Sequence, residues 1–255
     1  MRYTYTALLA LLLVCIAGGA WAQGLGESIW EKPGPEVSPV ASWLGGTGLM
    51  AIPSAQVRPA QTAQIFYHWL HNASQIDNVQ ENLQVYGADA MVTGDFEVGV
   101  TRLQNVTRLE TADSTTTAVF DSVTTFNGRY HLDLAKWTGN AEAPDVAIGV
   151  RDIADEVNRA LYVVVSKGFH LRNQQGPYDV TLTGGYGHTK DDAGILSGFF
   201  GGIDFTPGDN FRIQAEYDAQ DWNACVRFYP CRTLSIDLGT FDSNIGAGLT
   251  YESSW

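Results

Sequence analysis

The most constraining feature of the sequence is a strict alternation of apolar and polar residues, which is clearest in its last 50 or so positions. Over residues 211–218 one face would carry Phe211, Ile213, Ala215 and Tyr217, and the other Arg212, Gln214, Glu216 and Asp218. A repeat of two residues is the period of a β-strand and cannot form one face of a helix. Similar alternation occurs over residues 222–229, 234–239, 244–251 and 126–134. These segments predict β-strands.

Turn residues separate the predicted strands at short intervals. Examples are Thr206-Pro207-Gly208-Asp209 and Tyr229-Pro230. Connections this short join antiparallel neighbours, because a parallel crossover needs about a dozen residues. From residue 45 onward the chain offers about 12 to 14 candidate strands and no convincing helix. The pattern therefore predicts an antiparallel meander.

Alternation alone does not say which face of the sheet meets water. Aromatic residues lie at strand ends, where Tyr217 and Trp222 flank one turn, and the chain ends on Trp255. Both features are typical of membrane barrels, and a sheet of this size tends to close. We therefore expect an all-β fold, an antiparallel meander closed into a transmembrane outer-membrane β-barrel. The short turn at Ala219-Gln220 opposes this, because outer loops are usually longer. It keeps open a secreted soluble β-sheet module that binds glycans.

The first residues have the three parts of a secretory signal peptide. Arg2 supplies the positive charge, residues 7–17 form a short apolar run, and Ala20-Trp21-Ala22 provides small residues at a cleavage site. We expect residues 1–22 to be a signal peptide. Residues 23–44 contain three prolines and predict a periplasmic linker, followed by the barrel over residues 45–255. The expected location is the outer membrane of a Gram-negative-type bacterium, with lipid and lipopolysaccharide as surroundings.

Charge excludes one class of partner. The chain has 15 Lys and Arg against 28 Asp and Glu, a formal net charge of −13. A nucleic-acid partner needs a basic surface, so we expect none. Two cysteines follow the signal segment, Cys225 and Cys231. They can form a disulfide only if the chain turns before Pro230, because an extended strand would hold their Cα atoms beyond the roughly 7 Å limit. Both outcomes stay open.

The sequence carries no motif for a nucleophile, a metal site or a phosphate-binding loop. His68 and His71 are three residues apart beside a strand, so they would point to opposite faces and make poor joint metal ligands. We therefore predict a protein that is not an enzyme and has no cofactor and no metal. An outer-membrane barrel hydrolase is the enzymatic alternative, which would need a Ser/His or Asp/His pair at one rim.

Charged residues on the polar faces of the predicted strands would line the barrel interior. They are of both signs: Arg129, Asp133, Arg151, Asp204, Arg212, Glu216, Arg227 and Asp237. Opposite charges on neighbouring strands attract, which predicts an interior crossed by paired side chains and a poorly conducting barrel. Ile213, Val226, Ile236 and Leu249 would instead face lipid.

Several motifs occur in the order found in one known family. They are residues 45–55 (GGTGLMAIPSA), 149–153 (GVRDI), 162–168, 201–205 (GGIDF), and 215–218 (AEYD) leading to Asn223-Ala224. In this order they resemble the YjbH family, with residues 45–55 matching its first strand. The resemblance implies an outer-membrane barrel that assists the export or assembly of exopolysaccharide or another envelope polymer, with that polymer and export-machinery proteins as partners. This chain is much shorter than the long members of that family, which suggests a single-barrel version.

Overall fold

The structure is a computed structural model that describes residues 40–76, 79–112, 115–140, 143–173, 176–191, 194–208 and 210–255. The expected signal peptide and most of the expected linker lie outside these residues. In chain order the described strands are β1 (Thr62–Ile76), β2 (Val79–Met91), β3 (Phe96–Ala112), β4 (Thr115–Leu132), β5 (Asp145–Arg151), β6 (Ala160–Asn173), β7 (Gly176–Thr189), β8 (Gly198–Gly208), β9 (Phe211–Tyr217), β10 (Trp222–Cys231), β11 (Leu234–Phe241) and β12 (Asn244–Ser254). A short helix, α2 (Leu134–Thr138), lies between β4 and β5.

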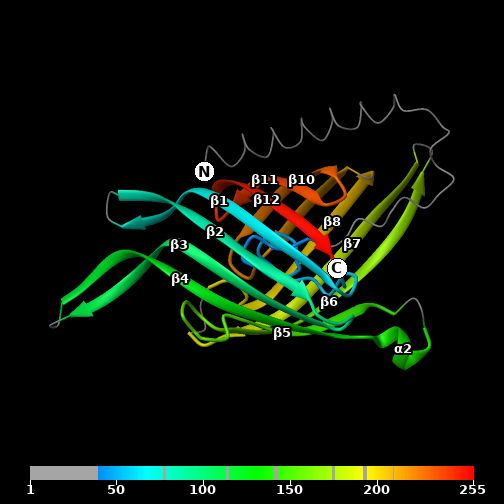
Figure 1. Cartoon of the computed structure of the whole chain (residues 1–255), viewed down its shortest axis with the longest axis horizontal. Helices are drawn as coiled ribbons and strands as arrows, with labels where there is room; N and C mark the ends of the chain where they lie inside the picture. The colour runs from blue at the N-terminus through cyan, green and yellow to red at the C-terminus, as the bar shows by residue number, and fades with distance from the viewer. Residues whose placement is uncertain are drawn as a thin grey trace.

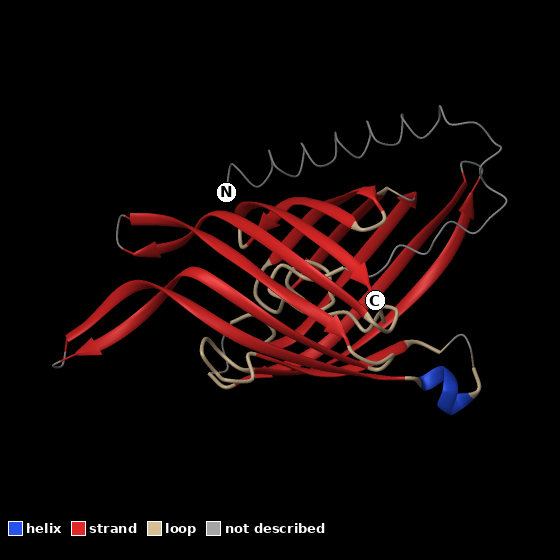
Figure 2. Cartoon of the chain, viewed as in Figure 1, coloured by secondary structure: helices blue, strands red, loops and turns tan. Residues whose placement is uncertain are grey.

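The strands form one closed barrel. Each strand pairs antiparallel with its neighbours in sequence, and β1 pairs with β12 to close the sheet, from Thr62 opposite Ser254 to Leu70 opposite Gly246. Figures 1 and 2 show the strands winding obliquely around a common axis. The predicted all-β antiparallel meander is confirmed, and the barrel has the lower of the expected strand numbers. None of the helices in the described residues has the length and apolarity of a membrane span.

Alternation along the strands separates the two surfaces of the wall. On β9 to β11, Arg212, Glu216, Arg227 and Asp237 are buried inside the barrel. Their neighbours in sequence face outward, as Ile236 and Leu238 do with exposed fractions of 43% and 60%. Large apolar side chains on the outside and charged ones inside are the pattern of a transmembrane β-barrel.

The two ends of the barrel are distinguished by which strand connections they carry. We call the end where β1 begins and β12 finishes the terminal end, and the opposite end, where the β1–β2 and β3–β4 connections lie, the hairpin end (Figure 1). Outward aromatic pairs mark both ends. Tyr217 lies 5.5 Å from Trp222 at the hairpin end, and Phe211 lies 5.0 Å from Phe228 at the terminal end. Aromatic belts at both edges of an apolar band are typical of membrane barrels.

The segment before β1 fills the interior instead of joining the wall. Residues 40–56, called the inner loop here, are almost entirely buried and make only two isolated bridges of their own, Ala41 with Thr47 and Gly48 with Pro53. Figure 1 shows this blue segment inside the ring of strands. Residues 45–55 are therefore not the first strand, which begins at Thr62. The last residues of the expected linker, 40–44, also lie inside the barrel.

The glycines of this segment explain its path. Gly45 and Gly46 both have positive φ, +90° and +76°, a conformation that side chains disfavour. A Cβ on Gly45 would also clash with the Thr101 hydroxyl of β3. The segment therefore turns tightly and lies close against the wall, which a regular strand with alternating side chains could not do.

The cysteines are not bonded. Cys225 points into the barrel and is buried, whereas Cys231 is exposed near the end of β10. The strand continues through both residues, with a register shift between Phe228 and Cys231. The turn that a disulfide required does not occur before Pro230.

Candidate functional site

The barrel interior is the candidate site, because the inner loop and the charged side chains of the wall meet there. Some backbone groups of the loop bond to one another, as Trp43 does to Met50, and buried groups that do not need partners from elsewhere. The wall supplies them through side chains: acidic and amide oxygens accept from backbone N–H groups of the loop, and arginines donate to its carbonyl oxygens. Three groups of contacts hold it.

The first group centres on Thr47 of the loop. Glu97 of β3 accepts from the Thr47 backbone N–H at 2.8 Å and also from its hydroxyl. Arg129, opposite Glu97 on β4, pairs with it at 3.0 Å and donates to the carbonyl oxygens of Thr47, Ser54 and Gln56. Arg58 adds a second ion pair to Glu97 at 3.1 Å. Glu97 and Arg129 thus hold the loop at Thr47 and again at residues 54–56, while Arg58 contributes a second positive charge beside Glu97.

The second group holds the tight turn at residues 50–52. Glu216 of β9 accepts from the backbone N–H groups of Met50 at 2.9 Å, Ala51 at 2.6 Å and Ile52 at 3.4 Å. From β5, Arg151 donates to the carbonyl oxygen of Ala51 at 2.8 Å. A buried carboxylate without a cation is costly unless hydrogen bonds satisfy it, and here the loop provides them.

The third group lies near the start of the loop. Arg227 of β10 pairs with Asp237 of β11 at 2.6 Å and donates to the carbonyl oxygen of Ala41. Asp237 accepts from the indole N–H of Trp43 at 3.2 Å. The Trp43 ring also stacks on His68, with ring centroids 5.3 Å apart. This ion pair therefore positions the largest side chain of the loop.

Apolar packing supplements these polar contacts. Ala41, Trp43, Met50 and Ala51 pack against inward side chains of the wall that include Phe66, Leu70, Val85, Cys225 and Phe241. Leu49, Ile52 and Ala55 pack in a second cluster with residues that include Val164, Leu196 and Phe200. The interior therefore combines two apolar clusters with charged wall side chains that bind the loop.

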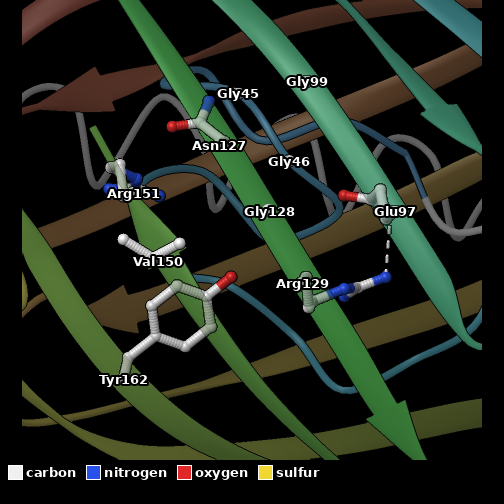
Figure 3. A pocket seen from close by; sticks show the side chains of 10 residues that line it. All are labelled: Gly45, Gly46, Glu97, Gly99, Asn127, Gly128, Arg129, Val150, Arg151 and Tyr162. Carbon is white, nitrogen blue, oxygen red and sulfur yellow. Dashed lines mark hydrogen bonds and ion pairs between the residues drawn. The ribbon is translucent and has the colours of Figure 1, made fainter. Parts of the chain in front are cut away.

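Little open space remains beside the loop. One pocket, drawn in Figure 3, leaves about 10 Å³ for the centre of a water-sized sphere, which is about what a single water molecule needs. It is lined by Gly45 and Gly46 of the loop and by residues of β3 to β6 that include Arg129, Arg151 and Tyr162. The Glu97–Arg129 ion pair forms one side of the pocket (Figure 3). A pocket of this kind does not provide a continuous path through the barrel.

The structure places most of the expected interior residues around the inner loop. Arg129, Arg151, Glu216, Arg227 and Asp237 contact it directly, either through its backbone or, for Asp237, through Trp43. Asp204 and Arg212 are buried on the wall, where they pair at 3.4 Å and Asp204 accepts from Gln214 at 2.9 Å.

Asp133 is not an interior residue. It follows the last residue of β4, and its side chain accepts from the backbone N–H of Lys136 at 2.8 Å, which caps α2. The alternation that places Arg129 inside ends with the strand, so extending it to Asp133 was wrong. The short helix was also not expected.

Sequence reasoning missed several interior residues. Glu97 and Asp89 both accept from the loop backbone, Asp89 from Gly46 at 2.9 Å. Gln64 accepts from Ala41 at 2.6 Å, and Ser166 from Ala55 at 2.9 Å. A signal was present for Glu97, because Phe96, Val98 and Val100 alternate with it along one strand. For the others, the partner is a loop that the sequence pattern did not place inside.

Within the described residues, no group of three or more His, Cys, Asp or Glu side chains is arranged to hold a metal ion. The two histidines considered above diverge as expected, since His68 is buried inside and His71 is exposed on the outer face.

No family model matches the sequence, and neither does any curated protein. Two solved structures align with most of the chain. The one described as "De novo design of transmembrane beta-barrels" covers 78% of this chain and 100% of its own, at 9% identity and a TM-score of 0.23. The "Low pH structure of Pseudomonas putida OprB" covers 76% of this chain and 91% of its own, at 12% identity and a TM-score of 0.30. Both superpositions are loose, so the fold rests on the strand pairing of this chain.

Proposed function

We propose that the protein is a non-enzymatic β-barrel of the bacterial outer membrane that assists the export or assembly of an exopolysaccharide or another envelope polymer. The membrane location is supported by the distribution of side chains on the barrel wall, which has apolar residues outside and charged residues inside. Its outward residues are apolar around the whole wall, as with Ile65, Val100, Leu182 and Leu249, which are 59%, 38%, 48% and 46% exposed. A soluble sheet would not leave so large a continuous apolar surface in water.

The filled interior supports a role that is not that of an open diffusion pore. The inner loop crosses the space that would form the channel, and its polar groups are paired with the wall. With the loop in place we expect the barrel to conduct poorly, because the loop, and not paired side chains alone, occupies its interior.

The polymer part of the proposal comes from the resemblance to the YjbH family, and the position of the resembling motifs supports it. Residues 45–55 form most of the inner loop. Arg151, Ser166 and Glu216, which lie in three of the other motifs, each bind its backbone. Motifs far apart in the sequence thus converge on one structural unit. That convergence is expected if the loop and its support are the shared functional part.

Two measurements test the proposal. The membrane part predicts that the protein fractionates with the outer membrane and migrates differently in gels when it is unboiled, since closed barrels resist detergent at room temperature. Recovery in the soluble periplasmic fraction would contradict it. The polymer part predicts that deleting the gene lowers surface or secreted polysaccharide, and that the wild-type gene restores it. Unchanged polysaccharide in the deletion strain would contradict that part alone.

A further inference from the structure

We propose that the barrel is a latent channel for ions and small hydrophilic solutes, which opens when the inner loop withdraws through the terminal end as one folded-back unit. This inference rests on the membrane location proposed above and goes beyond it, because it assigns the chain a transport activity of its own. Four features of the interior carry it.

The first feature is the path of the loop, whose two ends both lie at the terminal end. Val40 lies beside Arg232, Leu234 and Glu252, at the β10–β11 connection and near the end of β12. After the loop, the chain reaches the same end of the barrel at Gln61, which bonds through its backbone to Met91 and Trp255 directly before β1 begins. Because the loop enters and leaves on one side, it can move out without any chain being threaded through the barrel.

The second feature is the way the loop is held. The wall strands are joined by continuous backbone ladders, whereas individual side chains hold the loop. Glu216 alone accepts three of its N–H groups, and Arg129 alone donates to three of its carbonyls. Water can replace such bonds one by one, and the apolar packing of Trp43 and Leu49 opposes release at rest. The loop is therefore the unit most able to leave while the wall stays intact.

The third feature is what the loop would leave behind. Arg129 with Glu97, and Arg227 with Asp237, are pairs on adjacent strands, so they remain paired without the loop. A barrel of 12 strands is wider than the roughly 8-stranded barrels whose interiors side chains fill. The vacated space would be lined by charges of both signs, which suits hydrophilic solutes and gives weak preference between anions and cations.

The fourth feature is a buried cysteine, Cys225, whose accessibility to water depends on the position of the loop. Cys225 is buried in the cluster that contains Ala41, Trp43 and Met50 of the loop, whereas Cys231 is exposed outside that cluster. Withdrawal of the loop uncovers the Cys225 thiol to water. With Cys231→Ser removing the exposed thiol, the labelling rate of Cys225 measures how often the loop is out.

The experiment combines conductance with that labelling rate in planar bilayers and vesicles, using KCl and a small aqueous maleimide as probes. We expect the wild type to be nearly silent. Glu216→Ala removes the acceptor of three loop N–H groups, and we expect at least about a tenfold rise in both open time and Cys225 labelling. Glu216→Gln keeps one acceptor oxygen and should give a smaller rise. The matched control is Asp204→Ala, which breaks a buried ion pair whose described contacts lie on the wall.

A reversible lock keeps the test independent of folding defects. Ala55→Cys with Ser166→Cys joins the loop to β6 where the backbone N–H of residue 55 lies 2.9 Å from the side chain of residue 166. The lock is added to Glu216→Ala, with Cys225→Ala and Cys231→Ser. We expect no conductance when it is oxidised and openings after reduction. Openings of equal frequency when oxidised, equal openings from Asp204→Ala, or silence with no Cys225 labelling in Glu216→Ala would each overturn the latent channel. Failure of the wild type to insert into bilayers would instead contradict the proposed membrane location.

Discussion

Glu97 and Arg129 lie directly opposite each other on β3 and β4, and both bind Thr47 of the inner loop, one through its N–H and the other through its carbonyl. The same two side chains thus pair across the wall and fix the chain inside it. The Arg227–Asp237 pair repeats this arrangement with Ala41 and Trp43. In an open channel these charged side chains would line the pore. In this structure they bind the inner loop that fills the barrel.

The Arg227–Asp237 pair gives the first prediction. Both side chains are completely buried, so Arg227→Met leaves the Asp237 carboxylate without its cation. We expect a loss of about 3–5 kcal/mol in the free energy of unfolding. Arg227→Met combined with Asp237→Leu should recover much of it, because no unpaired charge remains. Urea unfolding in detergent micelles measures both, and equal losses in the single and double variants would contradict the prediction.

The second prediction concerns the outer face. Val226 faces outward between the inward Cys225 and Arg227, near the middle of its strand. Val226→Arg should destabilise the barrel in a bilayer by about 2–4 kcal/mol, since it places a charge in lipid. Thr240→Arg, close to the hairpin end of β11, serves as the control and should cost about 0–1 kcal/mol. Similar losses of stability at the two positions would contradict the prediction that Val226 lies at the centre of the apolar band and Thr240 near its edge.

The third prediction concerns the largest side chain of the loop. Trp43 is fully buried and packs on His68 and Gly246. Trp43→Ala should cost about 3–5 kcal/mol through the cavity it leaves. Trp222→Ala, at an outward position with 75% exposure, is the matched control and should cost far less in micelles. Unfolding midpoints of the two variants provide the comparison.

The fourth prediction is a pH effect at the hairpin end. Lys190 and Asp155 pair at 2.6 Å between the β5–β6 and β7–β8 connections. The hydrogen bond from Lys190 lowers the pKa of Asp155, and the same bond raises the pKa of Lys190. The pair therefore forms fully between the ordinary pKa of an aspartate and that of a lysine. It is lost as pH falls through the lowered pKa of Asp155. An NMR titration of the Asp155 carboxyl should show that lowered pKa, and Lys190→Gln should return it towards the ordinary value.

Local pattern predicted the wall well. Period two is set by the backbone of each strand, so it placed Arg212, Glu216, Arg227 and Asp237 inside without knowledge of any partner. The same rule placed Ile213, Val226, Ile236 and Leu249 outside, as the structure has them. The rule ends where a strand ends, which is why it misplaced Asp133 at the start of α2.

The inner loop was beyond such reasoning. Its conformation depends on side chains distant in sequence, since Thr47 binds Glu97 and Met50 binds Glu216. Glycine and proline in residues 45–53 indicate an irregular chain but not which surface covers it. The filled interior also affects how fast inward-facing positions react with water-soluble thiol reagents. Because Arg212, Arg227 and Asp237 are at most 5% exposed, cysteines placed there should label slowly from water while the loop is inside.

The measurement that tests the central claim most directly is disulfide formation between the inner loop and the wall in the outer-membrane fraction. Ser166 faces the loop on β6, and its neighbour Val165 faces outward with 40% exposure. In a background with Cys225→Ala and Cys231→Ser, Ala55→Cys with Ser166→Cys should oxidise to an internal disulfide, as read from the mass of the protein. Ala55→Cys with Val165→Cys should not. A bond at 165 that forms as readily as the bond at 166 would contradict a barrel filled by its own inner loop.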